Sequence, residues 1–329
     1  MHSTQTSEAI PARALSSVRH LPIGLFGSVM SMAGLSLAWR LANKSYGANI
    51  AVSNSIGIVA LLLFAVLALS YLGKFFQYPD LVKHEFLHPV LGSFFGTVGI
   101  SILLLSSVIS VYSASAQLVV WIIGAAATLA LSLVMISRLL NGNGSPTSVA
   151  PAWLIMGVGS LDIVVTGGAS SADWAHEVNL FSAAIGSVSA IIFFVLIFSR
   201  LVHHEPLVAG MRPSKMILVA PFAVGFIAYV TLVQKVDMFA SLLFYFGLFL
   251  FAIISYRLFI KPAPFSQSWW AIGFPMAALS NAALTYSSAV GGIGLGFIAV
   301  LLLFLLTASI AVLSIRTVHA LVTGRLLAA

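Results

Sequence analysis

Apolar stretches long enough to cross a lipid bilayer fill most of this chain and leave it few possible folds. Only 7% of its 329 residues are charged, against roughly 25% in an ordinary soluble domain, and its mean hydropathy is +1.09. A helix of about 20 apolar residues spans the hydrocarbon core. The sequence therefore predicts an all-α polytopic membrane protein with ten spans, at residues 21–40, 51–73, 89–111, 116–138, 150–167, 178–200, 214–233, 237–258, 268–287 and 293–316.

The ends of the chain are expected to be short tails around one membrane domain. We place an N-terminal tail at 1–20, the membrane domain at 21–322 and a C-terminal tail at 323–329. The first twenty residues are polar and contain Glu8 and Pro11, so we expect no cleaved signal peptide there. The chain has no cysteine, which excludes disulfides and thiolate metal sites.

Basic residues gather in alternate loops and thereby predict the orientation. Loops after even-numbered spans and the two tails hold twelve Lys and Arg residues, and the opposite side holds Arg40, Lys44 and Lys235. Because Lys and Arg concentrate in cytoplasmic loops, both termini are predicted to be cytoplasmic. The net charge of +7 is then mainly a signature of topology, and nucleic-acid binding has no support.

Prolines recur at similar places in the odd-numbered spans. They are 54 to 70 residues apart, and short connections join each odd span to the next even one; the five are Pro22, Pro89, Pro151, Pro221 and Pro275. Since proline kinks or breaks a helix, we predict five helical hairpins, each with one kinked helix. The five kinked odd helices would form an inner ring around a pore, inside a ring of the even helices.

Span nine, WWAIGFPMAALSNAALTY, carries Phe274-Pro275 within its apolar stretch. Pro275 removes one backbone donor and clashes with the carbonyl of Ala271, so a kink or opening is expected there. In a bilayer such a break is tolerated where protein or water satisfies the freed group. A large aromatic side chain beside a break predicts a helix that lines a pathway.

Hydroxyl and amide side chains also favour the odd spans. Those predicted to line the pathway are Ser93, Thr97 and Ser101 in span three and Ser280 and Asn281 in span nine. The alternative for each is that small residues merely allow close helix packing.

Asp162 is the acidic residue that lies well inside a span, where a charge is costly and usually functional. Three interpretations remain open: a carboxyl that carries a proton, a neutral acid hydrogen-bonded in the packing, or a residue near the outer end that water reaches. No span is predicted to contain a buried Lys or Arg. An anion would therefore depend on hydroxyls, backbone amides at helix breaks and the positive rim.

His84-Glu85-Phe86-Leu87-His88 matches the HExxH pattern of zinc proteases. That chemistry needs both histidines on one face of a continuous helix. Pro89 follows at once and disfavours helical dihedrals at His88, and the segment is predicted to be a cytoplasmic loop. We therefore expect no metal site, no cofactor and no enzyme, and keep a membrane zinc protease only as a remote alternative.

Several segments resemble the tellurite-resistance/dicarboxylate transporter family, which includes bacterial TehA proteins and the slow-type anion channels of plant guard cells. The resemblance covers nearly the whole chain from Leu21 to about Leu321. The segments that carry it are Leu21-Pro22-Ile23-Gly24, Leu35-Ser36-Leu37-Ala38-Trp39, His88-Pro89-Val90, the surroundings of Pro221, and Phe274-Pro275.

The resemblance implies a homotrimer in a bacterial inner membrane, with a pore in each subunit that a phenylalanine at the position of Phe274 occludes. It implies passive passage of small monovalent anions through this gated pore, as in the plant branch. The main alternative is proton-coupled transport of a dicarboxylate, sulfite or tellurite-like oxyanion, with Asp162 carrying the proton. Asp162 itself departs from a bare anion pore, since a permanent negative charge in the path would repel anions.

Overall fold

The chain folds into a bundle of helices. A computed structural model describes residues 18–142, 148–168 and 173–324, and these ranges contain helices and connections but no strand. Eight of the helices are long and apolar enough to cross a membrane, and the helix Pro151–Gly167 is apolar but shorter. The protein is therefore an all-α polytopic membrane protein. Most of the predicted tails, including Arg13 and Arg325, lies outside the described residues.

Five helices from successive parts of the chain form a closed inner ring through their mutual contacts. Around the ring each helix contacts the next, and the last one contacts the first; in order they are α1 (Gly27–Tyr46), α4 (Gly96–Ile109), α6 (Leu154–Gly167), α8 (Ala220–Val233) and α10 (Gly273–Val290). These helices correspond to the five odd-numbered spans of the sequence prediction.

Five longer helices cover the ring from outside. Each is the hairpin partner of the ring helix before it; they are α2 (Ile50–Gln77), α5 (Ala114–Leu140), α7 (Asp173–His203), α9 (Met238–Ile260) and α11 (Ile293–Val322). In α2 only 17% of the most apolar stretch is buried, against 72% in the segment Ile23–Tyr46 of the ring. The exposed side chains of the outer helices are large and apolar, such as Leu69, Phe76, Ile191 and Phe304, which suits contact with lipid.

Every ring helix is preceded directly by a tighter 3₁₀ segment. These segments are η2 (Ile23–Phe26), η3 (Leu91–Phe95), η5 (Pro151–Trp153), η6 (Ala209–Val219) and η7 (Gln267–Ile272). The predicted kink prolines lie near these segments: Pro22 and Pro89 just before one, Pro151 at the start of one, and Pro221 and Pro275 within three residues of the α-helix start. Pro221 and Pro275 thus lie close to where bonding changes from three residues back to four, whereas the other three prolines stand where a 3₁₀ segment begins.

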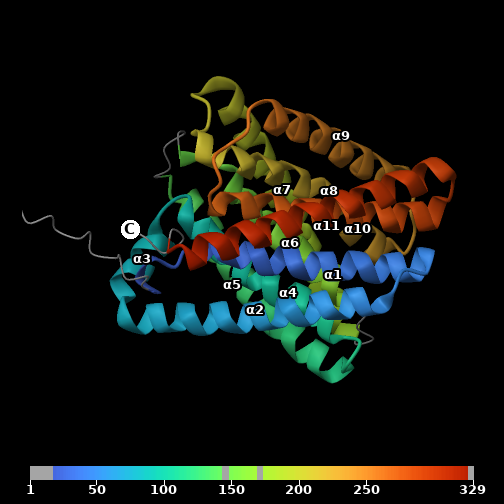
Figure 1. Cartoon of the computed structure of the whole chain (residues 1–329), viewed down its shortest axis with the longest axis horizontal. Coiled ribbons are helices and arrows are strands. Elements are labelled where there is room, and N and C mark those ends of the chain that lie inside the picture. The colour runs from blue at the N-terminus through green and yellow to red at the C-terminus, as the bar shows by residue number, and fades with distance from the viewer. Residues whose placement is uncertain (1–17, 143–147, 169–172, 325–329) are drawn as a thin grey trace, which may run out of the picture.

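The segment between α2 and η3 is helical, and the prediction of a loop there is wrong. Helix α3 (Pro79–Leu87) begins with Pro79 at its first position and Asp80 in its first turn, both of which favour a helix start. It lies at the end of the bundle where the described chain begins with η1 (Val18–His20) and where α11 ends (Figure 1). We call this end the α3 end.

At the opposite end, short connections join the two helices of a hairpin. Between α8 and α9, Asp237 accepts hydrogen bonds from the Tyr229 hydroxyl at 2.6 Å and from the backbone N–H of Ala240 at 3.1 Å. The bond from Tyr229 and the cap at Ala240 keep the pKa of Asp237 below its ordinary value, because both favour the ionised carboxylate. This connection therefore turns the chain back with its helix end capped.

Glycines let the outer helix α7 approach the ring helix α6 closely. A Cβ atom on Gly157 would lie 2.9 Å from the backbone nitrogen of Ala190, and one on Gly186 would lie 2.9 Å from that of Leu161. Backbone atoms cannot move aside as a flexible side chain can. The two helices are therefore packed at a distance that only glycine allows.

We predict that Gly157→Ala destabilises the protein by about 1–3 kcal/mol, the usual cost of overpacking. Gly73→Ala in α2 is the matched control, because nothing lies within 4 Å of the position of its added Cβ. In the control, the higher helix propensity of alanine should leave stability unchanged or slightly raised. Thermal unfolding of the purified variants in detergent measures both; equal midpoints for the two variants would contradict the close-packing argument.

Candidate functional site

A cavity of about 350 Å³ lies at the α3 end of the inner ring. All five ring helices contribute residues to its wall. The 3₁₀ segments before four of them, η2, η3, η6 and η7, contribute as well. Representative wall residues are Met30, Ile100, Val158, Ile217 and Phe274. Four of the five 3₁₀ segments, all but η5, line the part of the cavity nearest the α3 end, which we call its mouth.

The wall of this cavity is mostly apolar. Among the described residues that line it, the ionisable side chains are His20 and Glu85. The remaining hydroxyl and amide groups belong to Thr97, Ser214, Gln267 and Ser268. A ligand in this space therefore meets few polar partners, and binding by the wall alone would be weak.

Phe274 borders the cavity from the first turn of α10, and its side chain is buried. Gly273, immediately before it, lies against α1, since a Cβ there would be 2.2 Å from the Ser31 hydroxyl oxygen. This contact fixes the start of α10 against α1 and with it the position of the phenylalanine. Of the five kink prolines, Pro22 and Pro275 also line the cavity.

The hydroxyls predicted for span three do not share one surface. Thr97 lines the cavity and donates to the Phe94 carbonyl, while Ser101 donates to the carbonyls of Phe26 and Thr97. Ser93 lies in a different pocket, beside Pro89. The reason is that Ser93 belongs to a 3₁₀ segment, where residues four apart point about 120° away from each other, whereas an α-helix nearly aligns them.

Asp162 and Asn281 occupy equivalent positions on two ring helices. Each lies eight residues after the first residue of its α-helix, Leu154 or Gly273. Each is also seven residues beyond a cavity-lining residue, Ile155 or Phe274, and so on nearly the same helix face. At 1.5 Å per residue this is roughly 10 Å further into the bundle.

Both side chains are buried and incompletely bonded. The Asn281 amide donates to the Gly34 carbonyl at 3.2 Å, but its Oδ1 atom has no hydrogen-bond partner. Asp162 is 1% exposed, and its Oδ2 atom also has no partner. The hydroxyl of Ser280, the neighbour of Asn281, is buried and unpartnered as well. Unbonded buried oxygens are rare, and these three lie at the same level of the ring; others among the described residues belong to the outer helices α5 and α7.

The HExxH residues are not arranged as a zinc site. Helix α3 ends at Leu87, and the backbone of His88 is extended. The Nδ1 atom of the His88 ring accepts hydrogen bonds from the N–H groups of Val90 and Leu91. His84 and His88 therefore do not share a continuous helix. Within the described residues, no group of three or more His, Cys, Asp or Glu side chains could hold a metal ion.

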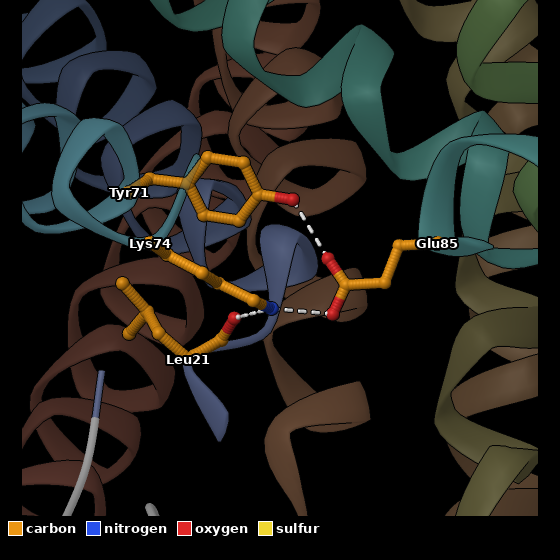
Figure 2. Close-up of polar contacts among 4 residues, drawn as sticks. All are labelled: Leu21, Tyr71, Lys74 and Glu85. Carbon is orange, nitrogen blue, oxygen red and sulfur yellow. Dashed lines mark hydrogen bonds and ion pairs between the residues drawn. The ribbon is translucent and has the colours of Figure 1, made fainter. Parts of the chain in front are cut away.

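The carboxylate of this motif is bound elsewhere. Glu85 accepts the Tyr71 hydroxyl at 2.7 Å and forms an ion pair with Lys74 at 2.5 Å (Figure 2). Lys74 lies within α2 and is 1% exposed, so the prediction that no span contains a buried Lys or Arg is wrong at this position. Tyr71 and Lys74 are three residues apart, which places them on one helix face. The sequence could not predict that Glu85 joins these two residues, because that contact requires α3 to fold back against α2.

Comparison with known proteins identifies the group to which this ring belongs. A family model described as voltage-dependent anion channel matches residues 20–318. The S-type anion channel SLAH2 of Arabidopsis thaliana is 26% identical over 315 residues, which cover 92% of this chain and 59% of that protein. The tellurite resistance protein TehA homolog of Haemophilus influenzae is 27% identical over 276 residues, covering 81% of each.

The guard cell S-type anion channel SLAC1 of Arabidopsis thaliana is 27% identical over 314 residues, covering 92% of this chain and 56% of that protein. This chain thus spans less than two thirds of the length of the two Arabidopsis relatives. The family model nonetheless extends over the ring, the cavity and both the Phe274 and Asp162 positions. The chain belongs to the voltage-dependent anion channel family.

Proposed function

We propose that each chain forms a conduit through which small monovalent anions pass passively, and that Phe274 is its gate. The observation that carries this proposal is a cavity to which all five ring helices contribute and which Phe274 borders. Family membership and the relatives named as anion channels support it. We propose no catalytic activity.

Orientation and assembly are part of the same proposal. The twelve-to-three distribution of Lys and Arg supports a cytoplasmic α3 end in a bacterial inner membrane. We propose ten crossings: the eight long apolar helices together with α6 and α10, which complete the ring. The likeness to the family supports a homotrimer in which every subunit keeps its own conduit.

The mainly apolar wall suits conduction better than tight capture. An anion held by few polar groups is released readily, and conduction requires that binding sites be weak enough to leave. Phe274 offers an uncharged obstacle: its removal opens space without changing the charge of the path. Gating by this side chain is therefore testable by size alone.

We predict that Phe274→Ala raises chloride or nitrate current in reconstituted bilayers about tenfold or more, because it removes a bulky side chain that borders the cavity. Phe222→Ala is a matched control, since Phe222 is a phenylalanine of α8 that lines a separate pocket facing α7 and α9. A current in Phe274→Ala no larger than that of wild type or control would reject the gate. Absence of anion current in every variant would reject the conduit.

A second candidate, proton-coupled transport of a dicarboxylate, sulfite or tellurite-like oxyanion, rests on Asp162. Its carboxyl is buried in α6, has an unpartnered oxygen and lies on the helix face that lines the cavity nearer the α3 end. A carboxyl in such a place suits a group that alternately takes up and releases a proton. In a passive conduit the same carboxyl would have to be protonated or lie off the path, because a permanent negative charge in the path would repel anions.

If Asp162 carries the coupling proton, Asp162→Asn abolishes the dependence of oxyanion uptake on a proton gradient, because an amide cannot exchange the proton. Uptake into vesicles with and without an imposed gradient measures this. Glu177→Gln, at an exposed position of α7, is the matched control for loss of a carboxylate. Gradient dependence that survives in Asp162→Asn would exclude Asp162 as the carrier, and passive flux unaffected by the gradient in wild type would exclude coupling altogether.

A further inference from the structure

Glu85 brings a negative charge to the mouth of the cavity, where an anion would enter. It is the carboxylate among the described residues of the cavity wall. Both of its oxygens are engaged: Oε2 accepts the Tyr71 hydroxyl at 2.7 Å, and Oε1 meets the Lys74 ammonium at 2.5 Å (Figure 2). A carboxylate at this place would repel an entering anion. The two groups that bind it, a hydroxyl and an ammonium, could equally bind an anion.

The two donors are positioned without help from Glu85. The Lys74 ammonium also donates to the Leu21 carbonyl at 2.7 Å, next to the cavity-lining Pro22. The ring of Tyr71 packs edge-on against Phe26 and Phe95, with ring centres 6.3 Å and 6.1 Å away. Both side chains are at least nine-tenths buried. Their donor groups would therefore stay in place if the carboxylate left.

Glu85 can leave by a change of its own side chain. It is 20% exposed, whereas Lys74 is 1% exposed. Helix α3 itself is fixed at its end, since Arg138 of α5 donates to the Phe86 carbonyl at 2.8 Å and stacks over the Phe86 ring. Rotation of the glutamate side chain toward the cavity needs no movement of that helix.

We propose that Lys74 and Tyr71 form an anion-binding site at the mouth of the conduit, and that the Glu85 carboxylate is a built-in competitor for it. The site takes a planar oxyanion, such as a carboxylate or nitrate, because Glu85 fills it with two oxygens that each accept one donor. This inference rests on the proposed passage of anions and gives that passage an entry site.

The charges explain why such a competitor matters. With Glu85 in place the ammonium is paired, and a buried ammonium left alone would be costly. An incoming anion that takes the place of Glu85 keeps the ammonium paired and frees the carboxylate to reach water. Entry is then an exchange of one anionic group for another. An anion at low concentration does not displace Glu85, so the site stays occupied by the carboxylate.

The test is nitrate binding to the purified protein, measured as the rise in thermal unfolding midpoint with nitrate at constant ionic strength. Glu85→Gln should lower the half-saturating nitrate concentration about tenfold, as expected for loss of one competing charge. Adding Lys74→Met or Tyr71→Phe to Glu85→Gln should reverse this gain. Asp80→Asn, in the exposed first turn of the same helix, is the matched control and should bind like wild type.

An unchanged half-saturating concentration in Glu85→Gln would overturn the proposal, and so would a gain that survives removal of Lys74. If Glu85→Gln does not fold, Tyr71→Phe alone serves, since it keeps the ion pair; it should weaken nitrate binding, and unaltered binding there would equally overturn the site. This test measures binding and not current. Absence of anion current in every variant would therefore reject the conduit, while the nitrate result would still be judged on its own.

Discussion

Backbone N–H and C=O groups inside a bilayer find no water, so the chain must satisfy them within its own helices. The departures from regular α-helix in this protein are gathered where that demand can be met. The five 3₁₀ segments precede the ring helices at the α3 end, and four of them, all but η5, line the cavity. There the altered ladder is sheltered by protein and opens onto a space, and the regular α-helices continue the ring beyond it. The shape of the cavity depends on this change of helix type.

The ring keeps its geometry through contacts of small residues and a few bonds between helices. Gly34 of α1 leaves room for Ala277 of α10, and the Asn281 amide binds the Gly34 carbonyl. Lipid tails are as apolar as the helix surfaces, so close packing and hydrogen bonds are the forces that hold helices together in a membrane. The position of Phe274 at the cavity is one result of the close α1–α10 contact.

The charged and polar side chains at the cavity and deeper in the ring have distinct environments. The cavity wall offers an anion few fixed partners, while a paired Lys74 and Glu85 lie beside its mouth. Deeper in the ring, Asp162 and Asn281 leave oxygen atoms unbonded at equivalent helix positions. An apolar cavity wall, a paired charge and a level with unbonded oxygens are three different environments in and beside one ring of helices. Phe274 belongs to the first, Glu85 to the second and Asp162 to the third, so substitutions there alter side-chain size, ion pairing and a buried carboxyl, respectively.

Sequence alone determined the helical class, the alternation of special and ordinary helices and the prominence of Phe274 and Asp162, because hydrophobic length, proline and intramembrane charge act locally. It could not show that Ser93 turns away from Thr97, since the choice between 3₁₀ and α-helix depends on the surrounding ring. Nor could it bring Glu85 to Lys74, eleven residues apart in the chain, because that contact requires α3 to form and fold back. Tertiary structure decided these points because helix type and ion pairing depend on neighbours that only the folded ring supplies.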